Sequence, residues 1–119
     1  MKSYRELIVW QKGIELVREV YKITGSLPRE ETYVLADQLR RAAISVPSNI
    51  AEGNGRLSTK EYIHHLSIAR GSLFEVETQL VLCVELGYIQ EEAVQSAYDL
   101  CGETGRLINA VVSRLRERI

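Results

Sequence analysis

The chain has 119 residues and a mass of 13.5 kDa, which suits one domain over residues 1–119 with a single core. With 45% hydrophobic residues, 26% charged residues and a formal net charge of -1, it is neither intrinsically disordered nor uniformly basic. No stretch approaches the ~20 apolar residues of a membrane span, and the N-terminus lacks the apolar run of a signal peptide, so we expect a cytoplasmic protein.

The first predicted helix follows Ser3, which forms a capping-box signature with Glu6 and precedes a helix that ends at Gly25. Apolar residues recur along it at steps of three and four, and we expect this stripe to face the core: Leu7, Trp10, Ile14, Val17, Tyr21 and Thr24. A second apolar stripe lies on another face of the same helix: Val9, Leu16, Val20 and Ile23.

The second predicted helix begins near Pro28 and ends near Glu52, with an apolar face of Leu39, Ala43, Val46 and Ile50. Its interior contains Pro47, which removes a backbone donor and costs about 3 kcal/mol in an ordinary helix. The opposite face is polar but mostly small: Arg41, Ser45, Ser48 and Glu52, with Gln38 and Asn49 beside them. We expect contacts on both faces to hold the proline-containing helix.

Two further helices have the same spacing. Ser58 and Glu61 form a second capping box, and the third helix then runs to Gly87 with this apolar stripe: Tyr62, Leu66, Ala69, Leu73, Val76, Leu80 and Cys83. The fourth starts near Gln90 and has its own stripe: Val94, Ala97, Cys101, Thr104, Ile108, Val111 and Leu115. Because the connections are short, we predict an all-α fold, an antiparallel up-down four-helix bundle.

Self-association is suggested by apolar surface that one core cannot use. The third helix has a second stripe of Ile63, Phe74 and Val81, and the first helix has its own. The small outward residues of the second helix would also allow another backbone to approach closely. The alternative is a slightly splayed monomer with broad apolar faces.

Charge is segregated along the chain. Residues 71–105 contain seven acidic and no basic residues, whereas residues 40–70 and 106–119 are predominantly basic. In an up-down bundle we expect these cations to gather at one pole: Lys2, Arg5, Arg56, Lys60, Arg114, Arg116 and Arg118. Such a pole would attract phosphate backbones. The alternative is that the pattern only complements the helix dipoles.

Motifs for chemistry are weak. Glu61 and His64 have the carboxylate–histidine spacing of di-iron bundles, but a single copy on a solvated face does not predict a metal site. The turn from Gly53 to Arg56 is a weak anion-site candidate without P-loop residues. We expect Cys83 and Cys101 to be reduced, packed thiols. With no activated nucleophile visible, we predict a protein that is not an enzyme and has no cofactor.

The stretch QLRRAAISVPSNIAEGNGR, Gln38 to Arg56, closely resembles the bacterial four-helix-bundle family encoded in intervening sequences of 23S rRNA genes, also labelled S23 ribosomal protein. WQKG from Trp10, IARGSLFEVETQL from Ile68 and LGYI from Leu86 extend this similarity over nearly the whole chain. The family also includes the accessory variability protein of diversity-generating retroelements. The resemblance implies ring-like homopentamers, association with RNA or DNA and, in the retroelement branch, binding to a reverse transcriptase.

Individual positions match the family motifs: Arg40, Arg41, Ser45, Pro47, Asn49, Glu52, Gly53 and Arg56 in the first, and Gly71, Ser72 and Glu75 in the second. We interpret Arg41, Ser45, Asn49 and Glu52 as candidates for a polar network around the proline. The leading hypothesis is a non-enzymatic homo-oligomer that binds nucleic acid through its basic pole. The family resemblance implies that the oligomer is a pentamer. One form of the hypothesis makes it an accessory to a nucleic-acid enzyme. The alternative is a protein-interaction scaffold without direct nucleic-acid binding.

Overall fold

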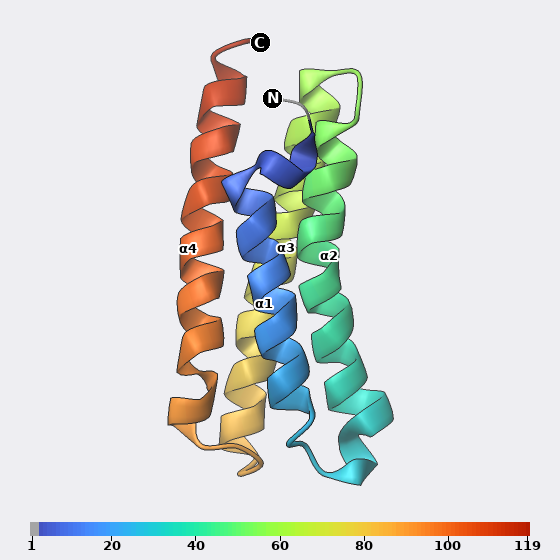
Figure 1. The fold of residues 1–119 in the computed structure, drawn as a ribbon, viewed down its shortest axis with the longest axis vertical. Coiled ribbons are helices and arrows are strands. Elements are labelled where there is room, and N and C mark those ends of the chain that lie inside the picture. The colour runs from blue at the N-terminus through green and yellow to red at the C-terminus, as the bar shows by residue number, and fades with distance from the viewer. Residues whose placement is uncertain (1–2) are drawn as a thin grey trace.

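The computed structural model describes residues 3–119 and contains four long helices that run alternately in opposite directions (Figure 1). Their bounds are α1 Ile8–Thr24, α2 Asp37–Asn54, α3 Thr59–Glu85 and α4 Glu91–Arg116. Each helix contacts the next along the chain, and α4 returns to contact α1. The prediction of an all-α, antiparallel four-helix bundle is therefore confirmed. No helix in this described part is long and apolar enough to cross a membrane.

The chain enters α1 through a separate turn, so the predicted continuous helix from Ser3 is wrong. Ser3 caps a short 3-10 helix, η1 (Tyr4–Glu6), by accepting a hydrogen bond from the Arg5 backbone N–H at 2.9 Å. Leu7 then takes an extended conformation and interrupts the helix. Because the side-chain amide of Gln11 donates to the Arg5 carbonyl at 2.9 Å, this turn is fixed to the start of α1.

The start of the second helix is also irregular, and regular α-helix begins at Asp37 rather than near Pro28. A 3-10 turn, η2 (Arg29–Glu31), is followed by a π-helical turn, η3 (Thr32–Ala36). The Glu31 carboxylate accepts from the Leu35 backbone N–H at 3.4 Å and from the Tyr88 hydroxyl at 2.7 Å. A side chain thus serves as the acceptor in this turn and connects it to the segment between α3 and α4.

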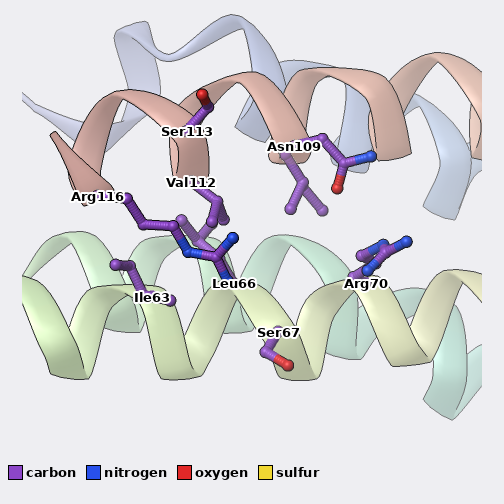
Figure 2. Close-up of a pocket in the computed structure, with 9 residues that line it drawn as sticks. Ile63, Leu66, Ser67, Arg70, Asn109, Val112, Ser113 and Arg116 are labelled. Atoms are coloured by element: carbon purple, nitrogen blue, oxygen red, sulfur yellow. The ribbon is translucent and has the colours of Figure 1, made fainter.

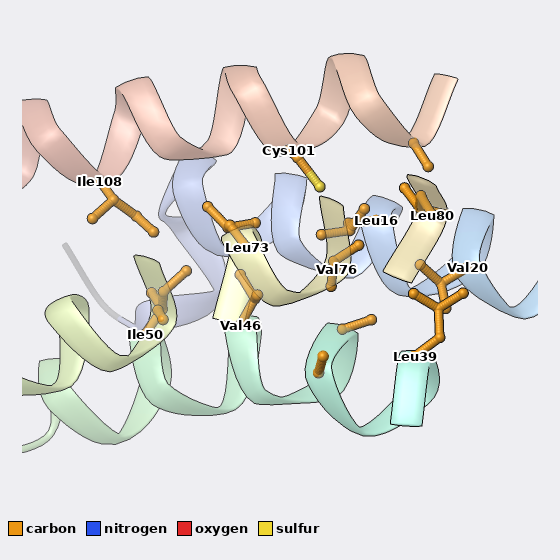
Figure 3. Close-up of a cluster of buried hydrophobic side chains, with 14 of the residues drawn as sticks. Leu16, Val20, Leu39, Val46, Ile50, Leu73, Val76, Leu80, Cys101 and Ile108 are labelled. Carbon is orange, nitrogen blue, oxygen red and sulfur yellow. The ribbon is translucent and has the colours of Figure 1, made fainter. Parts of the chain in front are cut away.

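The core lies along the axis of the bundle and uses the stripes predicted for three of the four helices (Figure 3). In α2 all four predicted residues are buried, and in α3 and α4 only Tyr62 and Val111 are less than fully buried. For α1 the prediction is wrong, because the stripe of Val9, Leu16, Val20 and Ile23 faces the core. Of the stripe expected there only Thr24 is buried, and the other members lie at the surface edge, with Tyr21 46% exposed.

Gly13 explains why α1 is turned in this way. It lies on the buried stripe, and a Cβ added to it would sit only 3.3 Å from the Cβ of Pro47 and 3.4 Å from its Cα and Cδ. Even an alanine at this position would therefore require Pro47 to shift by a few tenths of an ångström. The proline ring is itself buried inside α2, so α1 directs its glycine toward the proline and leaves Trp10 at the edge of the contact.

Candidate nucleic-acid interface

The cations predicted to gather do lie on elements at one end of the bundle. Arg5 belongs to η1, Arg56 to the α2–α3 connection and Lys60 to the first turn of α3, while Arg114 and Arg116 are in the last turn of α4. Figure 1 shows these elements together at the end where the chain begins and finishes. Lys2 lies outside the described residues. We call the described set the basic pole: Arg5, Arg56, Lys60, Arg114, Arg116 and Arg118.

Most members of the basic pole form no salt bridge with acids of the described chain. Arg56 is the exception, because its Nη2 lies 2.7 Å from Oε1 of Glu52. Within residues 3–119 the other five members form no salt bridge, and all five are exposed: Arg5, Lys60, Arg114, Arg116 and Arg118. Glu6, Glu61 and Glu117 lie on the same elements, so the positive potential at this end comes from the excess of cations over these acids.

The other end of the bundle is acidic. The elements there carry Glu30, Glu31, Glu85, Glu91 and Glu92. The bundle is 46 Å long, which is several Debye lengths at physiological salt, about 8 Å each. The acidic end therefore does not cancel the field of the basic pole. One of these acids, Glu31, accepts a hydrogen bond from the Tyr88 hydroxyl. This hydrogen bond raises the pKa of Tyr88.

A continuous line of polar contacts connects α2 to α3, and we call it the α2–α3 polar chain: Ser72, Ser45, Asn49 and His65, joined by hydrogen bonds, and Glu52. The Ser72 hydroxyl donates to Ser45 Oγ at 2.8 Å, and the Asn49 amide donates to the carbonyl and the hydroxyl of Ser45 at 2.9 and 3.0 Å. On its other side, Asn49 Oδ1 lies 3.0 Å from His65 Nδ1, which is 3.7 Å from the Glu52 carboxylate.

The polar chain holds together the two helices around the proline-containing segment. Three of the four residues proposed from the sequence belong to it, namely Ser45, Asn49 and Glu52. Arg41 does not join it, because its Nε lies 3.0 Å from Asp37 Oδ2 on the exposed face of α2. The partners His65 and Ser72 come from α3 of the same chain, and sequence reasoning did not place either of them there.

A groove between α3 and α4 begins at the basic pole. We call it the α3–α4 groove, with a volume of about 380 Å³. Its floor is apolar: Ile63, Leu66, Ile108 and Val112. Its walls are polar: Ser67, Arg70, Asn109, Ser113 and Arg116. Figure 2 shows Arg116 reaching from α4 toward α3, with Arg70 and Asn109 further along on opposite walls. Arg70 was not among the cations predicted to bind nucleic acid.

A second groove, between α1 and α2, is largely apolar. This α1–α2 groove has a volume of about 320 Å³ and is lined by residues that include Trp10, Ile14, Val17, Ile44 and Pro47. Three of these belong to the α1 stripe that was expected in the core. Their exposure follows from the close contact between Gly13 and Pro47, which fixes the rotation of α1.

The structure also places the weaker candidates for metal binding, anion binding and thiol chemistry. Glu61 and His64 are both exposed, and no group of three or more metal-ligating side chains forms anywhere in residues 3–119. Gly53 is buried in the last turn of α2, so it is not part of an open anion-binding turn. Cys83 and Cys101 are free and buried. Burial is the main cause that raises the pKa of Cys101 to about 12, which disfavours its nucleophilic thiolate.

Comparison with known proteins finds a family and similar solved structures. A family model described as 23S rRNA-intervening sequence protein matches residues 5–110. A crystal structure of a protein of unknown function from the S23 ribosomal protein family of Bacteroides thetaiotaomicron is similar, with a TM-score of 0.81 and 25% sequence identity. That similarity covers 88% of this chain and 98% of the other. A search of curated proteins returned no significant match.

Proposed function

The chain belongs to the family of 23S rRNA-intervening sequence proteins, and we propose that it is a non-enzymatic, homo-oligomeric bundle that binds RNA or DNA through its basic pole. The observation that carries the proposal is a group of five exposed cations at one end of the bundle, none of which forms a salt bridge within residues 3–119. Phosphate oxygens are the complementary partner for such a group, because arginine donates paired hydrogen bonds to them.

The size of the electrostatic contribution follows from the number of contacts. Five phosphate contacts on a duplex predict that the logarithm of the binding constant falls with the logarithm of salt concentration with a slope of about -4.5. Between 50 and 200 mM salt, each copy would then lose about 500-fold in affinity. The proposal therefore predicts binding that is strong only at low salt.

An electrophoretic shift assay at low salt with an RNA hairpin and a DNA duplex tests this proposal. Replacing Arg114, Arg116 and Arg118 together with Ala should abolish most of the binding. The matched control is the triple replacement of Arg18, Lys22 and Arg29 with Ala, which removes the same charge from α1 and η2. The proposal fails if the wild-type protein binds neither probe, or if the two triple variants weaken binding equally.

Self-association is the second part of the proposal and is supported by two surfaces on different sides of the bundle. One is the α1–α2 groove. The other is the outward face of α3 around Gly71, where an added Cβ would meet, among residues 3–119, no atom within 4 Å beyond the local backbone of α3. A glycine inside a helix costs about 1 kcal/mol relative to alanine, and in the described part of the chain nothing packs closely enough to require a glycine at this position. Two different surfaces that fit one another form a heterologous interface, which can close a ring.

Light scattering at micromolar concentration tests the assembly. A homopentamer has five times the 13.5 kDa mass of the chain, and a mass near 13.5 kDa would refute self-association. Replacing Ile44 in the groove with Lys should lower the mass, because a charge would be buried at the interface. Replacing the fully exposed Leu57 with Lys is the control and should leave the mass unchanged.

A scaffold that binds only proteins is the second candidate, and the apolar α1–α2 groove is the observation that favours it. The two candidates differ in their response to salt. A scaffold would show no shift of RNA or DNA at low salt, whereas contacts in its apolar groove would persist at high salt because burial of apolar surface is not screened.

A further inference from the structure

The α3–α4 groove combines an apolar floor with arginines at both ends, and we propose that it holds an unpaired nucleotide of single-stranded nucleic acid. The inference rests on the proposed function, since it assumes that the basic pole attracts nucleic acid. It adds a site that extends beyond that pole along α3 and α4, and it adds a preference for single strands over duplexes.

The phosphate contacts would come from Arg70 and Arg116. Arg116 forms no salt bridge and Arg70 touches only an aromatic ring, so within the described chain neither guanidinium has an acidic partner. No acidic residue lines the groove. The two arginines extend from different helices. Arg116 reaches from α4 toward α3 at the end of the groove that belongs to the basic pole, and Arg70 lies on α3 further along the groove (Figure 2). They are therefore placed to contact different phosphates of one strand.

The space between the two arginines suits a base. Its volume of about 380 Å³ is within the range of small-ligand sites, roughly 300–1,000 Å³. The floor of Leu66, Ile108 and their apolar neighbours can cover the face of a base, while the Asn109 amide can both donate to and accept from its edge. Such contacts need a base whose face and edge are free.

An aromatic residue next to the groove supports the preference for single strands. Phe74 is 56% exposed, and the Arg70 guanidinium lies 5.6 Å from the centroid of its ring. Both line a smaller hollow of about 180 Å³ that shares Asn109 with the α3–α4 groove. Unpaired bases stack on aromatic rings and on arginine planes, whereas bases within a duplex are already stacked and paired. Sequence reasoning treated Phe74 only as part of an apolar stripe.

Fluorescence anisotropy at one fixed, low salt concentration tests the inference, with a labelled ten-nucleotide oligouridylate and a labelled ten-base-pair RNA duplex as probes. The wild-type protein should bind the single strand more tightly. Replacing Arg70 with Gln should weaken binding of the single strand about tenfold and of the duplex less than twofold. Replacing Phe74 with Ala, which changes no charge, should have the same selective effect. Arg18→Gln, an exposed arginine on α1, is the control and should change neither.

The outcomes separate this inference from the proposed function. If the wild-type protein binds both probes and loses both on replacement of Arg114, Arg116 and Arg118, while Arg70→Gln changes nothing, the basic pole binds nucleic acid and the groove does not. Equal weakening of both probes by Arg70→Gln would also overturn the groove site. If the wild-type protein binds neither probe, both proposals fail. Circular dichroism confirms the fold of each variant, whose substituted residue is exposed in every case.

Discussion

Replacing Gly53 with Ala should destabilise the bundle, although alanine is the better helix former. Gly53 is buried in the last turn of α2, where this helix meets the start of α3. A Cβ at this position would lie 2.7 Å from the Cβ of His65, 3.0 Å from Cδ1 of Tyr62 and 3.2 Å from the Tyr62 carbonyl oxygen. The first and the last of these atoms are fixed to the backbone of α3, so the two helices must separate to admit the methyl group.

The magnitude follows from opposing terms. Overpacking that cannot be relieved by a side-chain rotation costs about 3 kcal/mol, the upper end of the usual range. The higher helix propensity of alanine returns about 1 kcal/mol. The net loss is therefore about 2 kcal/mol, or a fall in Tm of about 8 °C for a domain of this size. Separation of the helices would also lengthen the 3.0 Å contact between Asn49 and His65, which adds to the loss.

Thermal and urea denaturation followed by circular dichroism measure the effect, at one protein concentration because association shifts apparent stability. Gly105→Ala is the matched control. Its new Cβ would lie 3.7 Å from Leu73 Cδ1, an ordinary contact, so the variant should gain up to about 1 kcal/mol. The reasoning would be refuted if Gly53→Ala melted at or above the wild-type temperature.

Three other predictions concern local interactions. Asn49→Ala should lower the free energy of unfolding by about 1–3 kcal/mol in urea denaturation, because its serine and histidine partners lose their link; an unchanged midpoint would contradict this. With its pKa raised to about 12, Cys101 should react with a thiol reagent at pH 8 only after unfolding, and rapid native labelling would contradict its burial. The hydrogen bond to Glu31 raises the pKa of Tyr88, so its stabilising effect is present below pH 10.0 and is lost as pH rises through the folded pKa. An absorbance titration should show that Glu31→Gln removes one late-titrating tyrosine, and an identical titration curve would exclude this contact.

In three helices the most regular apolar stripe is also the buried one, so the core face could be predicted from the sequence. In α3 the stripe of Leu66, Ala69 and Leu73 repeats at every turn and is buried, whereas the second stripe has only three members and its Phe74 and Val81 are exposed. In α1 two apolar stripes compete, and the spacing of three and four residues favoured the wrong one. The deciding residue was Gly13, which periodicity does not score because it has no apolar side chain.

The basic pole and the α3–α4 groove also differ in whether they could be predicted from the sequence. The basic pole could be predicted because the ends of up-down helices must meet, whatever their rotation. The α3–α4 groove could not, because it depends on the alignment of Arg70 with Asn109 across two helices. Helical periodicity fixes the face of each residue but not the longitudinal position of one helix against another.

Pro47 inside α2 also determines which residues of α1 lie at the surface. An unsupported Pro47 would destabilise α2 by about 3 kcal/mol, but here its ring is buried against the backbone of Gly13. This contact requires α1 to turn its glycine inward, and the same rotation leaves Trp10 and Ile14 at the surface beside the proline. The contact that supports the proline thus also creates the apolar α1–α2 groove. A residue larger than glycine at position 13 should therefore affect stability and self-association together.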